Sequence, residues 1–307
     1  MKLNKKWLFI PAGLLIPGLI VFYLVFPSEL VVTAARVVRC NASAAMRVVS
    51  DPDKGWAEWW PGVKGDNSGY RIRGHAFSAV AADLKLGRDT LSVVLNLLTV
   101  GVQDSTELLW QYRIKTDGTP WSRWEAYRRS RRIEGRLREL LVPLGDWLEK
   151  NENLYGMDVK VVMSKDSTLI SMPLETAGYP SVEELYGAIH ELRKYIADQG
   201  AREVEQPMLS AMPKGDGRYT SKVAIPVDRE LKGTKSYLPM RFVPWKVLTG
   251  EVRGGASTAE NAIRQLHLYV VDHQYTEMAM SFQRLVTERD RESDTSRWVT
   301  RVITPVP

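Results

Sequence analysis

The chain opens on a continuous apolar run and then changes to alternating and helical patterns of hydrophobic residues. Residues 7–26 contain no charged side chain. Twenty residues in a helix span about 30 Å, the thickness of the hydrocarbon core of a bilayer. Three lysines, Lys2, Lys5 and Lys6, precede the run and favour a cytoplasmic N-terminus. The sequence therefore predicts a single-pass membrane anchor within residues 1–29, with the later domains facing the periplasm or exterior. A cleaved signal peptide is the alternative.

Residues 30–150 combine strand patterns with helical ones. Alternating apolar positions are typical of strands with one buried face, and helical spacing of apolar residues is typical of amphipathic helices. We expect strands over residues 31–38, 90–99 and 110–114, a short helix over residues 42–49, and a long helix over residues 124–150 that is interrupted near Pro143.

The stretch DPDKGWAEWWPG at residues 51–62 follows the short helix. It resembles the opening of START/Bet v 1-like domains, the SRPBCC or polyketide-cyclase-like superfamily. The resemblance implies a helix-grip fold over residues 30–150, in which a sheet wraps around a long helix and encloses an apolar cavity. Trp56 and Trp60 would then line a ligand cavity. The alternative is that these tryptophans fill the core.

Residues 155–307 contain an internal repeat. RYTSKVAIPV at residues 218–227 and RWVTRVITPV at residues 297–306 lie 79 residues apart and are identical at four of ten positions. An amphipathic helix with an S-x-x-E capping box precedes each copy, at residues 181–184 and 257–260. Each repeat is thus predicted as strand, helix, strand, strand. Two such repeats predict an α+β arrangement with a ligand-sized groove where they meet.

This duplicated pattern resembles the GyrI-like effector-binding domain of multidrug-responsive transcription regulators. The quotable matches are GYPSVEELYGAIHELRKYIADQG at residues 178–200, GGASTAENAIRQLHLYVVDHQY at residues 254–275 and SFQRLVTERDRESDTSRWVTRVITPV at residues 281–306. The resemblance implies that residues 155–307 bind hydrophobic, often cationic, organic molecules between the repeats.

The expected ligand site depends on one departure from that family. Its members commonly carry a buried glutamate on the strand after the second helix, and Gln283 stands at that place here. An amide carries no charge, so Gln283 favours a neutral or anionic ligand. Aromatic residues expected to line the groove with it are Tyr186, Trp245, Tyr269, Phe282 and Trp298. The alternative for each is ordinary core packing.

Composition excludes several kinds of chemistry. The single cysteine, Cys40, rules out an internal disulfide framework, and the four histidines are too dispersed to predict a metal site. No P-loop, dinucleotide fingerprint, G-x-S-x-G elbow or helix-turn-helix occurs, so neither a cofactor nor nucleic acid is expected. Net charge is +6, and the basic run at residues 113–138 is interpreted as a solvated helix face.

These patterns predict a membrane-anchored, non-catalytic protein whose partners are a lipophilic or aromatic small molecule and the membrane. Two alternatives stay open. One is a hydrolase or cyclase-like enzyme that uses one of the two cavities. The other is an envelope scaffold that binds a protein partner.

Overall fold

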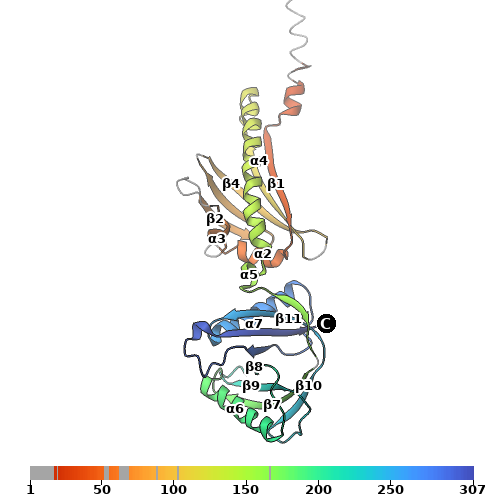
Figure 1. Ribbon diagram of the computed structural model, residues 1–307. Coiled ribbons are helices and arrows are strands. Elements are labelled where there is room, and N and C mark those ends of the chain that lie inside the picture. Colours follow the sequence, from red (N-terminus) through yellow and green to blue (C-terminus); the bar gives the residue numbers. More distant parts are fainter. Residues whose placement is uncertain are drawn as a thin grey trace, which may run out of the picture. The chain divides into compact units, whose positions relative to one another are not determined.

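The computed structural model describes residues 17, 18, 20–51, 55–61, 69–87, 89–101, 104–165 and 167–307. The chain divides into two compact units: the first ends at Glu149 and the second comprises Lys150–Pro307. Each unit has its own antiparallel sheet, with five strands in the first and eight in the second (Figure 1). The predicted mixed α+β fold is therefore confirmed, and each unit is described separately below.

The sheet of the first unit has the strand order β1-β5-β4-β3-β2. Its strands are β1 (Glu29–Val38), β2 (Gly69–Ala76), β3 (Ala79–Leu86), β4 (Asp89–Thr99) and β5 (Thr106–Lys115). The alternation read from the sequence decides which face of β4 is buried: Leu91, Val93 and Leu95 are fully buried and the residues between them are not. The predicted strands at 31–38, 90–99 and 110–114 are confirmed.

The helices of the first unit are α2 (Ala42–Val49), α3 (Trp56–Trp59) and α4 (Pro120–Leu148). Helix α4 lies along the sheet (Figure 1) and contacts β1 and β5. Its start is fixed by Thr119, whose side chain accepts a hydrogen bond from the Ser122 backbone N–H. The predicted interruption near Pro143 is wrong. Leu137, Leu141 and Leu144 are buried on both sides of that proline, and their packing offsets the hydrogen bond that it removes.

The second unit contains eleven strands and helices in the following order, together with a short 3-10 helix at Thr295–Arg297. They are α5 (Asn151–Tyr155), β6 (Lys160–Met163), β7 (Ser167–Thr176), α6 (Val182–Asp198), β8 (Met208–Pro213), β9 (Tyr219–Val227), β10 (Leu238–Phe242), β11 (Lys246–Arg253), α7 (Ala256–Asp272), β12 (Phe282–Leu285) and β13 (Val299–Val306).

The predicted duplication is confirmed. The two repeats are β7-α6-β8-β9 and β11-α7-β12-β13, and the sheet order is β10-β7-β9-β8-β12-β13-β11-β6. The repeats meet where β8 pairs with β12. Each repeat is preceded by a short strand that pairs with the other repeat: β6 pairs with β11, and β10 pairs with β7.

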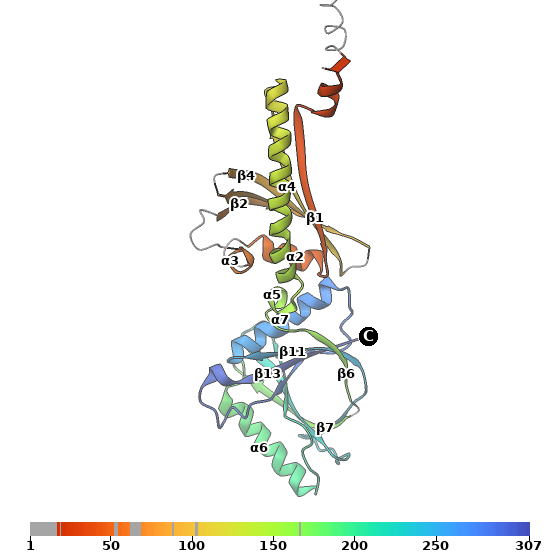
Figure 2. The ribbon, with the colours of Figure 1, turned by 45° about the horizontal axis from the view of Figure 1, so that its top comes forward.

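This exchange of short strands curls the sheet (Figure 2). β6 ends at Met163 and β7 begins at Ser167, although the two strands lie near opposite ends of the sheet order. The two linkers also bond to each other: the Ser164 N–H donates to the Trp245 carbonyl at 2.7 Å, and the Trp245 N–H donates to the Ser164 hydroxyl at 2.8 Å. The sheet therefore has an inner face and an outer face.

Helices α6 and α7 cover the outer face, α6 over β7 and β9 and α7 over β11 and β13. The capping box of α6 is confirmed, because Ser181 and Glu184 bond each other's backbone N–H. The capping box predicted at residues 257–260 is wrong. Helix α7 is capped by Gly255 with no side-chain bond, and Glu260 instead accepts a hydrogen bond from the Tyr219 hydroxyl at 3.0 Å.

The predicted single-pass membrane localisation is contradicted. A spanning helix needs about 20 predominantly apolar residues. Within the described part of the chain, no helix has both the length and the apolar character to cross a bilayer. Residues 7–16 and 19 of the predicted anchor lie outside the described residues.

Candidate ligand-binding site

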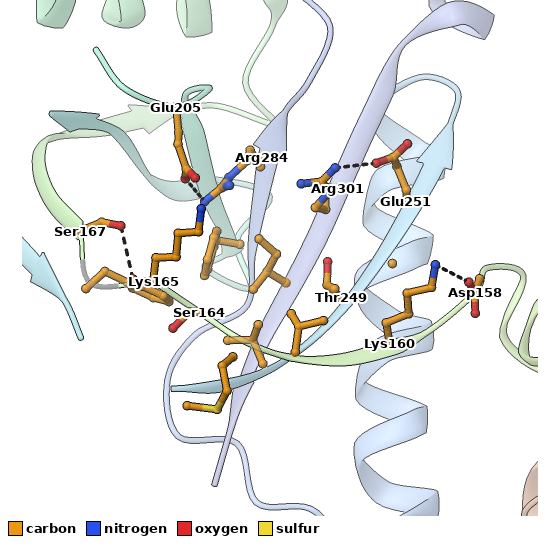
Figure 3. A pocket seen from close by; sticks show the side chains of 17 residues that line it. Asp158, Lys160, Ser164, Lys165, Ser167, Glu205, Thr249, Glu251, Arg284 and Arg301 are labelled. Carbon is orange, nitrogen blue, oxygen red and sulfur yellow. Dashed lines mark hydrogen bonds and ion pairs between the residues drawn. The ribbon is translucent and has the colours of Figure 1, made fainter. Parts of the chain in front are cut away.

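A cavity of about 650 Å³ lies on the inner face of the curled sheet (Figure 3). We call it the inner cavity. Its lining is Asp158, Lys160, Val162, Met163, Ser164, Lys165, Ser167, Glu205, Phe242, Val247, Thr249, Gly250, Glu251, Phe282, Arg284, Arg301 and Ile303. Both halves of the second unit contribute. The volume lies within the range of about 300–1,000 Å³ that is usual for small-molecule sites.

The pairing of the strands arranges the side chains that line the inner cavity in rows across the sheet. Every second residue of a strand faces the same side of the sheet, and residues paired across neighbouring strands lie next to each other. One row runs across β12, β13, β11 and β6 in the order Phe282, Ile303, Thr249, Lys160. The row beside it is charged and runs from Arg284 through Arg301 to Glu251.

The apolar part of the inner face belongs to one buried cluster that both repeats build. Its members are Leu169, Met208, Ala224, Val247, Phe282 and Ile303, with Phe242 packed against them. The rings of Phe242 and Phe282 meet edge to face, with centroids 5.6 Å apart. This cluster gives the inner cavity an apolar floor on which an aromatic or aliphatic body can lie.

The charged part consists of ion pairs. Arg284 meets Glu205 at 2.7 Å, Arg301 meets Glu251 at 3.0 Å, and Lys160 meets Asp158 at 2.9 Å (Figure 3). Arg284 is the least exposed of these six residues, with 16% of its side chain exposed. Burial lowers the pKa of Arg284, and Arg301 on the neighbouring strand lowers it further, while Glu205 raises it. The Arg284 guanidinium is thus a costly charge that Glu205 only partly compensates.

Two polar atoms of the lining are buried without a hydrogen-bond partner among the described residues. They are the hydroxyl oxygen of Thr249 and Nε of Arg284. Buried polar groups are normally paired, so an unpaired one next to a cavity marks a place where a ligand or water completes the hydrogen bonding.

Gln283 lies on the outer face, not in the inner cavity. It is 1% exposed, and its side-chain oxygen accepts a hydrogen bond from the Tyr179 hydroxyl at 3.0 Å. Burial raises the pKa of Tyr179. Tyr186 is also on this face, where its hydroxyl donates to the Thr287 carbonyl and accepts from the Arg289 N–H.

Arg289 occupies the middle of this outer cluster. It is 4% exposed, lies over the Trp298 ring at 5.0 Å from the centroid, and donates to the Thr300 hydroxyl at 2.7 Å. Two residues selected from the sequence, Tyr186 and Trp298, therefore contact an internal arginine, and Gln283 is linked to that arginine through Tyr179. Of the selected set, Phe282 lines the inner cavity.

The other selected aromatics lie apart from both clusters. Tyr269 on α7 packs against Tyr155 and stacks on His273. Trp245 is in the β10–β11 linker and is 38% exposed. Trp56 and Trp60 are in the first unit, where Trp56 is fully buried and donates to the Val49 carbonyl at 2.7 Å. Their role in ligand binding stays a prediction.

The charged row of the inner cavity was missed by sequence reasoning, although a signal for it exists. Phe282 and Gln283 are neighbours in one strand, so they face opposite sides of the sheet, and Arg284 shares the side of Phe282. Applying the same alternation to the second repeat copy places Arg301 and Ile303 on one face.

Comparisons with known proteins give likenesses of structure alone. No family model and no curated protein matches this chain. Among solved structures, the EcmrR–DNA complex matches with 14% identity and a TM-score of 0.45, over 59% of this chain and 70% of that one. SAV2435 bound to tetraphenylphosphonium matches with 14% identity and a TM-score of 0.33, over 49% and 94%.

A hydrolase from Listeria innocua matches with 11% identity and a TM-score of 0.37, over 48% of this chain and 91% of that one. All three TM-scores are below 0.5, so no function follows from these matches. The duplicated strand–helix–strand–strand arrangement of the second unit is the one that the resemblance to GyrI-like domains implies, so the fold expected from that resemblance is confirmed. The resemblance of residues 30–150 to START/Bet v 1-like domains stays a prediction.

Proposed function

We propose that the second unit binds a lipophilic or aromatic small molecule in the inner cavity and catalyses no reaction on it. The observation that carries the proposal is a ligand-sized hollow whose floor is an apolar cluster shared by both repeats. On this proposal residues 155–307 form the binding domain, and residues 30–150 form a separate START-like domain.

The apolar floor supplies the affinity in this proposal. Covering apolar surface with a ligand contributes about 25 cal/mol per Å² removed from water. Phe282, Ile303 and Val247 present such surface on three different strands. A flat ring system placed over them would contact all three strands at once.

The lining favours binding over chemistry. Nucleophilic catalysis needs a nucleophile within hydrogen-bond reach of a base. Among the described residues that line the cavity there is no histidine, cysteine or tyrosine, and the carboxylates of Asp158, Glu205 and Glu251 are each held by a cation. Such paired carboxylates are poor general bases, because the cation favours their charged form.

A titration with N-phenyl-1-naphthylamine, a neutral dye that fluoresces in apolar surroundings, tests the proposal. The full chain is titrated as wild type, Thr249→Val and Thr249→Trp. Thr249→Val keeps the size of the side chain and removes the unpaired hydroxyl, so dye binding that depends on the apolar floor should remain saturable. Thr249→Trp fills the middle of the row that runs from Phe282 to Lys160, so saturable binding is expected to disappear.

Two outcomes would refute the proposal. One is the absence of saturable dye binding to the wild-type chain. The other is binding of equal strength to wild type and to a folded Thr249→Trp variant, which would place the dye elsewhere. Circular dichroism and thermal unfolding establish that each variant is folded.

A further inference from the structure

We propose that the inner cavity selects organic anions, namely molecules with an apolar body and one carboxylate or sulfonate group that binds between Arg284 and Arg301. This inference rests on the proposed function, because it names the class of ligand for the same cavity. It differs from the cation preference that the GyrI-like resemblance implies.

The main observation is a pair of like charges placed directly opposite each other. Arg284 on β12 and Arg301 on β13 are register partners in adjacent antiparallel strands. Directly opposed residues have Cβ atoms about 5 Å apart, and like charges at that distance destabilise the sheet. Both side chains line the inner cavity. An anion between them would turn this repulsion into two attractions.

The two arginines have donors to spare. A guanidinium carries five N–H groups in a planar fork. Each arginine uses one terminal nitrogen for the ion pair with its glutamate, Arg284 with Glu205 and Arg301 with Glu251. Nε of Arg284 is buried and has no hydrogen-bond partner among the described residues. A planar carboxylate or a sulfonate matches such donors well.

The charge of the lining agrees with this assignment. Four cationic residues, Lys160, Lys165, Arg284 and Arg301, face three carboxylates, Asp158, Glu205 and Glu251. The balance among these described lining residues is therefore 4 − 3 = +1. All three carboxylates are held by Lys160, Arg284 or Arg301, so an incoming cation would have to break an existing ion pair, whereas an incoming anion would not.

The rows also fix where the anionic group sits relative to the apolar body. Arg284 is two residues from Phe282 along β12, and Arg301 is two residues from Ile303 along β13. Two residues of a strand span about 7 Å. The row from Phe282 to Lys160 crosses from β12 to β6, three strand spacings, or about 14 Å, and its apolar end is at Phe282 and Ile303. The ligand is thus an elongated ring system or chain with its charge at one side.

A matched pair of dyes tests the inference. 8-Anilinonaphthalene-1-sulfonate has the aromatic body of N-phenyl-1-naphthylamine plus one sulfonate. We expect the sulfonate dye to bind the wild-type chain at least about tenfold more tightly at low salt, a difference of about 1.4 kcal/mol. We also expect its advantage to shrink as sodium chloride is added, because salt screens exposed charges.

Three variants locate the effect. Arg301→Gln should bring the affinity for the sulfonate dye to within about threefold of the affinity of the same variant for the neutral dye. Glu251→Gln releases Arg301 from its ion pair, so it should tighten sulfonate binding. Arg253→Gln is the matched control for Arg301→Gln, because Arg253 is an exposed arginine of β11, the strand that pairs with β13, and does not line the cavity.

The outcomes separate the two proposals. If Thr249→Trp abolishes the saturable binding of neither dye, the proposed function itself is refuted. If the neutral dye binds at that site but the sulfonate dye binds no better, anion selection is refuted. It is also refuted if Arg301→Gln and Arg253→Gln weaken sulfonate binding equally, or if Glu251→Gln weakens it. Because Glu251 is 48% exposed, its variant keeps the test decisive even if Arg301→Gln does not fold.

Discussion

The hydrogen bond between Tyr179 and Gln283 allows a quantitative test of how the outer face is held together. The Tyr179 hydroxyl donates to the Gln283 side-chain oxygen at 3.0 Å, and Gln283 is 1% exposed. Gln283→Leu removes the acceptor and keeps a side chain of similar size. The tyrosine hydroxyl then loses this partner at a partly buried position and faces an apolar side chain instead. We expect the free energy of unfolding to fall by about 1–3 kcal/mol.

Tyr179→Phe makes the opposite change, because it leaves the amide oxygen of Gln283 unpaired. The expected loss is again about 1–3 kcal/mol. The double variant replaces both polar partners with apolar groups, so it should lose clearly less than the sum of the two single losses. The difference is the coupling between the two side chains.

Urea unfolding of the four proteins, followed by circular dichroism, measures this double-mutant cycle. Additive losses would refute the interpretation, because additivity would mean that the two side chains do not depend on each other. Losses below about 0.5 kcal/mol in both single variants would also refute it, since that is the size expected of a solvated surface site.

Four further predictions concern other parts of the chain, two of them at Cys40. Burial raises the pKa of the Cys40 thiol from 9.0 to about 11, which lowers its thiolate fraction about a hundredfold near neutral pH. Thiol labelling at pH 8 should therefore be at least about a hundredfold slower in the folded chain than in urea. Comparable labelling rates in the two states would contradict this prediction. The raised pKa also means that the neutral thiol stabilises the fold below pH 9.0 and that this contribution is lost as the pH rises toward 11, so wild type should lose more stability than Cys40→Ala over that interval. Ser181→Ala removes the cap of α6 and should lower the unfolding free energy by about 1 kcal/mol in thermal unfolding, whereas no measurable change would mean that the capping box is unimportant. Arg193 forms ion pairs with Glu203 at 2.8 Å and with Glu288 at 2.6 Å, and its hydrogen bond is the main cause that lowers the pKa of Glu288. Arg193→Met should therefore lower the free energy of unfolding, and this loss should become smaller as salt is added. A loss that does not depend on salt would point to packing instead.

The local elements of both units were predictable because their signals are local. The alternation of β4, the capping box at Ser181 and the helix that follows it depend on residues a few positions apart. The repeat at residues 218–227 and 297–306 also predicted that β9 and β13 are equivalent strands. Pro143 shows the limit of such reasoning, since packing against a distant sheet overrides a strong local preference.

Strand alternation could have placed Arg284 with Phe282 and Arg301 with Ile303, but the meeting of these residues in one site could not be predicted, because it depends on pairings between distant segments. That Arg284 faces Arg301 follows from the register of β12 and β13, which no local pattern specifies. The inner cavity itself depends on the pairing of β6 with β11. Gln283 illustrates the consequence: motif comparison placed it at a buried position but could not identify Tyr179 as its partner, and its role in ligand binding stays a prediction.

The apolar run at residues 7–26 shows a limit of prediction from hydropathy. Hydropathy and length favoured a spanning helix, and the described part of the chain contains none. Two prolines, Pro11 and Pro17, interrupt the run, and each removes a backbone donor from any helix that includes it.

The exchange of β6 and β10 between the repeats has a consequence for how the second unit gains and loses its structure. Lys246 and Met163 are register partners, 246 − 163 = 83 positions apart, whereas β8 and β9 form a hairpin. The ends of such a long loop must be brought together before their contacts stabilise the fold. We therefore expect the pairing of β6 with β11 to be a late and slow step of folding. The strand that precedes each repeat pairs with the other repeat, so neither repeat completes its part of the sheet alone. The backbone amides of the two repeats should therefore gain and lose protection from hydrogen exchange together.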